Sequence, residues 1–314
     1  GLAWLDQWGS LRYTANTAFV AFVYGDFLAG SGGDPALVTR YHDFAASQID
    51  YILGDNPNNR SYVVGYGDNP PTEPHHRTAH GSWCDNIGDP VDSRHVLYGA
   101  LVGGPDAADQ YTDDRSDYIQ NEVATDYNAG FTGALARMVM GHGGAPNPLF
   151  PEAEARDDEF FVEAKINSEG PRYVEISARL NNRSAWPARA PQDLRFRYFV
   201  DLTAEFDAGY TLADLDVTTA YCQADGVSDL LVWDAADDLY YVEVTFLNGS
   251  VYPGGQSAFR KECQFRIALP FNSNDPEFDA GGDPSFPGIV SGNYNVTDLI
   301  PVYEGATPVF GLEP

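Results

Sequence analysis

The chain has little positive charge and few lysines, and each shortage excludes a class of function. Lysine occurs only twice, and the 18 lysines and arginines stand against 46 acidic residues, which gives a formal net charge of −28. A surface of this sign repels phosphate groups, so nucleic acids and anionic membranes are poor partners. Apolar runs long enough to span a bilayer are absent from the sequence as well. We therefore expect a protein that acts on neither nucleic acid nor membrane.

Cysteine is also scarce, and this limits the covalent cross-links. The chain has three cysteines, and an odd number cannot all pair within one chain. Cys222 and Cys263 both lie in the second half of the sequence and could bridge each other. Cys84 then stays outside this bridge, with pairing to another polypeptide as one alternative.

The residues that are present divide into two parts by the spacing of apolar side chains. In the first part, residues 10–30 and 34–53 have the spacing of helices. A glycine- and proline-rich stretch at residues 141–148 then indicates a boundary. The length suits two domains. We place these at residues 1–146 and 147–314.

The second part shows the alternation of strands that have one buried face. Apolar and polar residues alternate over four segments, which are residues 174–180, 194–200, 240–246 and 263–269. Several such segments joined by turn-rich loops predict an antiparallel β-sandwich. The predicted fold class is therefore multi-domain, with an all-α part followed by an all-β antiparallel sandwich.

The most informative segment of the first part, residues 111–129, sets one glutamate, Glu122, among aromatic and amide residues. Asp113 suits the N-cap of a helix that runs to Met140. In that helix Glu122 and Tyr127 lie on one face. A carboxyl group shielded by an aromatic ring keeps its proton to higher pH than an exposed one, as a general acid requires. The alternative is a solvated or ion-paired helix residue, which is the usual state of a glutamate.

A second cluster lies in residues 61–83, which we expect to form a long ordered loop. His75, His76 and His80 fall close together here, beside Arg77. Zinc binding is one alternative, although the spacing differs from that of two histidines on a helix in an HExxH motif. Hydrogen bonding to backbone carbonyls is a second alternative, for His76 and His80. The remaining interpretation is that the loop binds a ligand rich in hydroxyl groups.

Both segments resemble the active-site motifs of family 9 glycoside hydrolases, which cut β-1,4-glucans such as cellulose. The segments that begin at Trp4, Tyr51 and Leu101 are similar to the same family and come in the expected order. The resemblance implies the later half of an (α/α)6 barrel and an endo-β-1,4-glucanase. It places Glu122, His75 and Asp113 in the catalytic machinery, and Arg77, Tyr127 and His76 at the substrate.

The resemblance also implies an inverting mechanism, in which two carboxylates stand roughly 6.5–9.5 Å apart on opposite sides of the scissile bond. Glu122 would be the acid, whereas the family's base belongs to an early Asp-Ala-Gly-Asp motif that this chain lacks. Asp279-Ala-Gly-Gly-Asp283 resembles that motif but lies in the second part. We therefore expect the base on a missing N-terminal catalytic portion, in the same or a companion chain. The alternatives are an inactive glucan-binding fragment and an enzyme that cuts xylan or mixed-linkage glucan.

Residues 252–267 and 300–305 resemble family 3 carbohydrate-binding modules, of the subtype fused to family 9 catalytic domains. This resemblance implies a module that guides a glucan chain and makes cleavage processive. It further implies a calcium site, for which Asp201, Asp279 and Asp283 are the candidates, with solvated acids as the alternative. Because cellulose is insoluble, we expect the protein to be secreted and extracellular.

Overall fold

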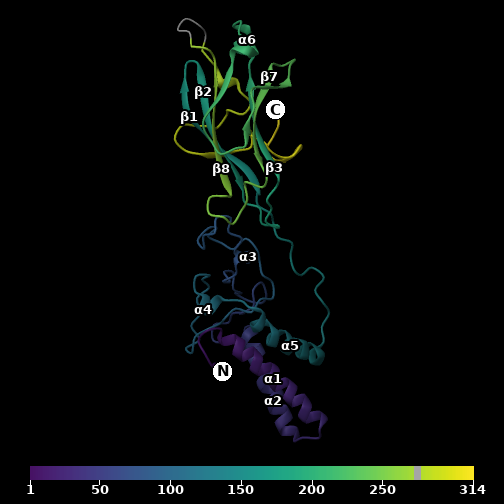
Figure 1. The fold of residues 1–314 in the computed structure, drawn as a ribbon. Helices are drawn as coiled ribbons and strands as arrows, with labels where there is room; N and C mark the ends of the chain where they lie inside the picture. The colour runs from purple at the N-terminus through teal and green to yellow at the C-terminus, as the bar shows by residue number, and fades with distance from the viewer. Residues whose placement is uncertain (272–276) are drawn as a thin grey trace. The chain divides into compact units, whose positions relative to one another are not determined.

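The computed structural model describes residues 1–271 and 277–314, and it divides into two compact units (Figure 1). These are Gly1–Ser82 with Ile87–Ala155, and Trp83–Asn86 with Arg156–Pro314. The first unit contains the long helices and the second contains the named strands, as the sequence predicts. The boundary expected at residue 146 falls in the segment between α5 (Thr125–His142) and β1 (Phe160–Gly170).

Three helices form the framework of the first unit. α1 (Ser10–Gly30) packs against α2 (Pro35–Leu53) and against α5. Their shared core contains small and branched side chains such as Ala15 and Ile49, which are fully buried. The first two helices lie where the apolar spacing predicts them.

The ends of α2 follow from local chemistry. Asp34 Oδ1 accepts the N–H of Ala36 at 2.9 Å, and Pro35 occupies the first turn, where its missing N–H costs nothing. The helix ends at Gly54, whose φ of 136° is unfavourable for a residue with a Cβ. These two signals are visible in the sequence, so the helix could be placed accurately.

One face of α1 and α2 is apolar and open to solvent. Its exposed side chains are Phe19, Val20, Val23, Tyr24, Phe27, Leu37 and Phe44. Part of this open helix face is a groove of about 430 Å³ that Val20, Tyr24 and Phe44 help to line. Amphipathic helices normally bury such a stripe, so the face is suited to packing against further polypeptide. Among the described residues, no helix has the length and apolar character needed to cross a membrane.

The segment around Glu122 is not the single helix that the sequence predicts. A short helix, α4 (Tyr118–Asn121), is capped by Asp117, and the expected cap, Asp113, lies outside it. Glu122 follows α4 in an extended conformation, and α5 begins three residues later. The prediction of one continuous helix was therefore wrong.

Backbone pairing explains this interruption. Glu122 has a φ of −59° and a ψ of 140°, and it forms a parallel bridge with His75. Val123 forms an antiparallel bridge with Val102. Both bridges need an extended backbone, which a helix cannot supply. Glu122 and Tyr127 therefore come together across a turn and do not share a helix face.

The second unit is a β-sandwich in which the neighbouring strands of each sheet run antiparallel. Its five-stranded sheet has the order β4-β8-β2-β1-β9, and its six-stranded sheet has the order β11-β10-β3-β7-β5, with β6 paired to β7. The strands after β1 are β2 (Tyr173–Asn182), β3 (Asp193–Asp201), β4 (Asp216–Cys222), β5 (Gly226–Val227), β6 (Leu231–Asp234), β7 (Leu239–Leu247), β8 (Arg260–Ala268), β9 (Asn295–Thr297), β10 (Val302–Glu304) and β11 (Thr307–Phe310). Short helical turns are α3 (Arg77–His80) in the first unit, and α6 (Thr203–Asp207), η1 (Leu212–Asp214) and η2 (Ala280–Gly282) in the second.

The core of the sandwich confirms the predicted alternation. Ile176, Phe196, Val242 and Phe265 come from β2, β3, β7 and β8, and each is 0% exposed. All four belong to one apolar cluster contributed by both sheets. The polar residues between them therefore point away from the core.

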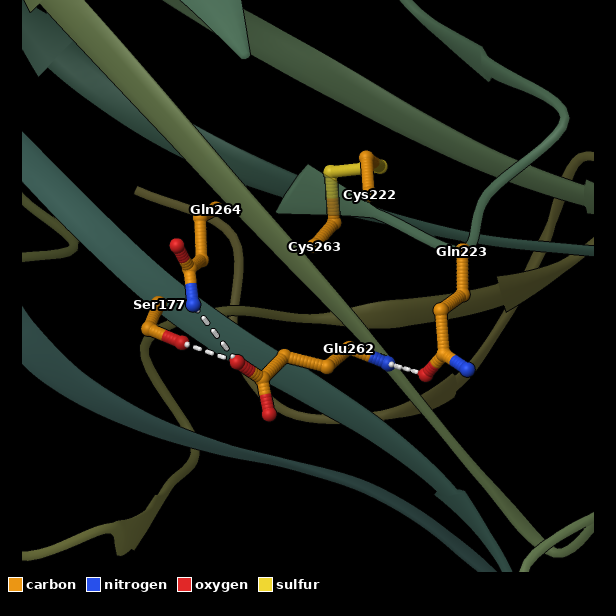
Figure 2. Close-up of a disulfide and its surroundings, with 6 residues drawn as sticks. All are labelled: Ser177, Cys222, Gln223, Glu262, Cys263 and Gln264. Atoms are coloured by element: carbon orange, nitrogen blue, oxygen red, sulfur yellow. Dashed lines mark hydrogen bonds between the residues drawn. A yellow bond between two sulfur atoms is a disulfide. The ribbon is translucent and has the colours of Figure 1, made fainter. Parts of the chain in front are cut away.

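A disulfide joins Cys222, at the end of β4, to Cys263 in β8, and Figure 2 shows it beside its polar neighbours. The two cysteines stand opposite each other in the strand register. β4 is an edge strand, so the disulfide attaches an edge of the sheet to its interior. The pairing that the sequence suggested is confirmed.

Candidate active site

Glu122 lies between two hydrogen-bond donors. The indole Nε1–H of Trp8 donates to Glu122 Oε2 at 2.8 Å, and the Tyr127 hydroxyl donates to the same oxygen at 2.9 Å. Within the described part of the chain, no other side-chain hydrogen bond reaches this carboxylate. A carboxyl group held in this way can carry a proton on Oε1 while its other oxygen is fixed.

The Tyr127 hydroxyl is a permanent donor. Tyr127 is only 1% exposed, and burial, followed by the bond to Glu122, raises its pKa far above the usual range. The phenol therefore keeps its proton. Gly9 makes room for it, because a Cβ at this position would lie 2.5 Å from the Tyr127 oxygen. Gly9 also has a φ of 65°, which favours glycine.

Aromatic rings surround the carboxylate. The rings of Trp8 and Tyr118 lie 5.2 Å apart, and those of His75 and Tyr118 lie 6.0 Å apart. Trp8 and Tyr118 are each nearly half exposed, at 45% and 47%. Exposed rings of this kind offer a flat apolar surface on which the face of a sugar can rest.

His75 is brought next to Glu122 by the backbone. Its N–H donates to the carbonyl of Asn121 at 2.8 Å, in the same pairing that forms the bridge to Glu122. Its Nδ1 lies 2.6 Å from the carbonyl oxygen of Arg115. The structure thus assembles two of the residues expected in the catalytic machinery.

Asp113, the third of these residues, holds the histidine loop. Its Oδ2 accepts the N–H and the hydroxyl of Thr72 at 2.8 and 3.0 Å, and its Oδ1 accepts the N–H of Glu73 at 3.0 Å. Each oxygen of the carboxylate is thereby engaged with the loop. These hydrogen bonds suit a residue that fixes the conformation of the histidine loop at the site.

The other loop residues have distinct surroundings. His76 Nδ1 accepts the N–H of Ala79 and so caps α3, and His80 Nε2 bonds the carbonyl of Pro90 at 2.9 Å. Burial lowers the pKa of both histidines. Arg77, the first residue of α3, is exposed. Among residues 1–271 and 277–314, no three histidine, cysteine or acidic side chains converge as a metal site would require, so the zinc alternative has no support.

Two residues of the site were not identified from the sequence. Trp8 bonds a carboxylate that is 114 positions away, and no local pattern reveals such a pairing. The guanidinium of Arg12 lies over the rings of Tyr13 and Tyr127, at 4.5 and 5.2 Å from their centres. The family-like segment that begins at Trp4 was the signal in the sequence that could have identified these two residues.

The acids considered for calcium lie near a further buried glutamate in the second unit. Asp283 is 1% exposed, and its carboxylate accepts the Tyr198 hydroxyl and the Asp201 N–H, each at 3.1 Å. Glu205 is 2% exposed; its Oε1 accepts the N–H of Asp279, whereas its Oε2 is buried without a hydrogen bond. Burial raises the pKa of Asp283 and of Glu205. An uncompensated buried oxygen of this kind fits a cation.

The five-stranded sheet carries a polar strip, formed by Ser177, Arg179, Glu262, Gln264 and Tyr294. Glu262 Oε1 accepts bonds from Ser177 at 3.1 Å and Gln264 at 2.8 Å, as Figure 2 shows, and Oε2 accepts Arg179 Nε at 2.9 Å. The Arg179 guanidinium lies 3.5 Å from the ring centre of Tyr294. Although burial opposes it, these three hydrogen bonds lower the pKa of Glu262, so the strip holds a charged carboxylate.

Comparison with known families agrees with the two units. Residues 1–135 match the model of glycosyl hydrolase family 9, and residues 161–311 match that of a cellulose binding domain. Residues 1–135 thus belong to glycosyl hydrolase family 9, and residues 161–311 to the family of cellulose binding domains. The helical part of the chain is the C-terminal part of the family 9 domain, and the β-sandwich is the binding domain.

Similar proteins extend over both parts. The chain is 52% identical to endoglucanase 4 of Bacillus sp. strain KSM-522 over all of its own length and 48% of that protein. It is also 52% identical to endoglucanase A of Bacillus pumilus, of which it covers 47%. The crystal structure of endoglucanase CelQ from Clostridium thermocellum complexed with cellotriose matches the whole chain with a TM-score of 0.95 and 50% identity, over 52% of that protein. The chain thus spans about half the length of these relatives.

Proposed function

We propose that this chain is part of a cellulase that hydrolyses internal β-1,4-glucosidic bonds, with Glu122 as the general acid. The observation that carries the proposal is the fixed Glu122 carboxylate, with donors from Trp8 and Tyr127 on one oxygen and His75 beside it. The names of the two Bacillus relatives and the cellotriose bound to CelQ support the substrate class.

The proposed step transfers the proton from Glu122 Oε1 to the glycosidic oxygen as its bond to the anomeric carbon breaks. Negative charge then develops on the carboxylate. The Trp8 and Tyr127 donors are already aimed at Oε2 and stabilise this charge without rearrangement. A second carboxylate takes a proton from the attacking water, which gives inversion. In this proposal that base belongs to a further portion of the enzyme.

The open helix face is suited to receive that portion. Exposed apolar side chains of α1 and α2 would be covered if more helices completed an (α/α)6 barrel, and the relatives have about twice the length of this chain.

The competing proposal is a glucan-binding polypeptide without turnover, and the cellulose binding domain is what favours it. Xylan and mixed-linkage glucan are alternative substrates for the same site chemistry.

Reconstitution separates these proposals. The chain is mixed with the preceding helical portion of a relative, and release of reducing sugar from cellulose, xylan and mixed-linkage glucan is measured. We expect activity on cellulose in the mixture and a loss of roughly 10²- to 10⁴-fold with Glu122→Gln. Glu152→Gln, at an exposed glutamate of the same unit, is the matched control. Full turnover with Glu122→Gln would refute the assignment of the acid.

We further propose that the polar strip guides a glucan chain and makes cleavage processive. Hydrogen-bonding groups and the Tyr294 ring suit a single sugar chain that must slide. Replacing Arg179 by alanine is expected to lower the ratio of soluble to insoluble reducing ends from cellulose, with little change on short soluble glucans. Arg195→Ala, in β3 of the other sheet, is the control. Equal loss on both substrates would argue against guidance.

Calcium and secretion complete the proposal. The buried Asp283 and Glu205 would hold a calcium ion with backbone carbonyls, which calcium readily accepts as ligands, and Asp201 and Asp279 would have to move toward the ion, because no three acidic side chains of the described residues already converge as a metal site. The bound ion would supply structural stability. Calorimetric titration tests it, since Glu205→Gln should abolish calcium-dependent heat.

Secretion is supported by the disulfide, because such bonds persist in oxidising compartments. Detection of the protein in culture medium tests it.

A further inference from the structure

The ring of His75 is fixed by one backbone carbonyl. Its Nδ1 lies 2.6 Å from the carbonyl oxygen of Arg115. A carbonyl oxygen only accepts hydrogen bonds, so Nδ1 must carry a proton. In the neutral ring the lone pair is then on Nε2. The position of the Arg115 carbonyl therefore decides which nitrogen atom His75 offers to a ligand.

That carbonyl is held in place by the side chain of the same residue. Arg115 is only 6% exposed, and its Nε and Nη2 both donate to Glu73 Oε2, the first at 2.8 Å. Its Nη1 donates to the carbonyls of Ile87 and Pro90 at 3.2 and 2.9 Å, and Nη2 also reaches the carbonyl of Val91. Lysine has neither the planar shape nor the five donors for this arrangement.

Glu73 restrains the other side of the same hydrogen bond. It stands two positions before His75, and its carboxylate also accepts the N–H and the hydroxyl of Ser93 at 3.0 and 3.1 Å. Its own N–H donates to Asp113 at 3.0 Å. The Arg115–Glu73 ion pair therefore holds both the donor ring of His75 and the carbonyl that accepts from it.

We propose that Arg115 and Glu73 are positioning residues that fix the Nδ1-protonated tautomer of His75 and so present Nε2 as an acceptor for a sugar hydroxyl. The inference rests on the active-site role that the family resemblance implies for His75, and it specifies that role as contact with the sugar. A neutral His75 held in this way is selective for its ligand, because it binds a group that donates a hydrogen bond and rejects one that only accepts.

Long-range ¹H–¹⁵N NMR spectra of the histidine side chains read this tautomer directly in the full chain, without turnover. The signal of His75 is the one that disappears in His75→Gln. We expect the proton on Nδ1 in the unmodified chain and a mixture of tautomers in Arg115→Lys. Arg137→Lys is the matched control, because Arg137 forms a similar two-bond ion pair with Asp26 on α1. It should leave the tautomer of His75 unchanged.

A milder variant covers the case in which Arg115→Lys does not fold. Ser93→Ala removes one donor to Glu73, and near-ultraviolet circular dichroism checks its fold. A changed tautomer population in Ser93→Ala then supports the proposal, and an unchanged one overturns it. A proton on Nε2 in the unmodified chain, or an unchanged tautomer in folded Arg115→Lys, also overturns it.

The complete enzyme supplies an independent measurement. Misplacing His75 in Arg115→Lys is expected to lower kcat/KM on soluble glucan by roughly ten- to a hundred-fold, because small displacements of substrate-contacting groups are costly. If the tautomer behaves as expected and His75→Gln leaves kcat/KM unchanged, the proposed role of His75 fails while the positioning by Arg115 and Glu73 stands.

Discussion

At the scale of single residues, the proposed acid is defined by the donors around it. Tyr127→Phe removes one of the two hydrogen bonds to Glu122 Oε2 and keeps the ring. The carboxylate formed after proton transfer then loses one donor, so kcat should fall about ten-fold, the equivalent of about 1.4 kcal/mol. Steady-state kinetics of the reconstituted enzyme measure this. Tyr66→Phe, at an exposed tyrosine, is the control, and a kcat equal in both variants would contradict the prediction.

We expect two histidines, the buried His80 and the half-buried His76, to make the stability of the helical unit depend on pH. His80 is 5% exposed, and burial lowers its pKa, as it lowers that of His76. Below about pH 6.5 the unfolded chain binds protons at these sites that the folded chain does not, so stability is lost as pH falls. Urea midpoints measured from about pH 7.5 to 5 should therefore decrease, and less steeply in His80→Gln. An identical slope in the two proteins would count against this cause.

The residues of the site differ in whether the sequence alone could identify them. Glu122 and His75 stand in family-like motifs, so the sequence identified both, and the structure places them side by side. Trp8 could not be assigned a role, because its bond to Glu122 is set by the packing of distant segments. The burial of Asp283, a calcium candidate, could not be predicted from the sequence either, because its neighbours on the strand are far away in sequence.

At the scale of elements, the interrupted helix at Glu122 depends on one glycine. A Cβ on Gly103 would lie 2.4 Å from the carbonyl oxygen of Ile119 and 2.9 Å from that of Gln120, both in α4. Gly103→Ala should therefore push α4 away and destabilise the helical unit by about 1–3 kcal/mol, as other overpacked sites do. Urea unfolding measures the change. Gly30→Ala is the control, because its added Cβ meets no atom within 4 Å apart from those of its chain neighbours and its own helix.

Elements with local signals were predicted well, and those set by distant pairing were not. α2 has a cap, a proline and a terminal glycine in its own sequence, and the strands have a clear period. The break before α5 comes instead from bridges to His75 and Val102, which are 47 and 21 positions from their partners. Helix propensity alone could not reveal it.

At the scale of the whole molecule, the two units differ in how they are held together. The disulfide in the β-sandwich spans 41 positions, and closing a loop of that length stabilises the folded state by roughly 4 kcal/mol. Calorimetry of the double variant Cys222→Ala, Cys263→Ala should show a lower transition for the sandwich alone. Addition of a reductant to the unmodified chain should act in the same way. A matching decrease in the helical unit would show that the units do not unfold independently.

The contacts of Glu122 also set an order of events during synthesis. Trp8 leaves the ribosome long before the glutamate that it bonds, and Tyr127 follows five residues after that glutamate. The Glu122 side chain therefore has no fixed geometry until α5 has emerged and folded back on α1. A nascent chain that stalls before this point has a Trp8 indole without its acceptor, so under the proposed function translation itself delays the moment at which the active site can form.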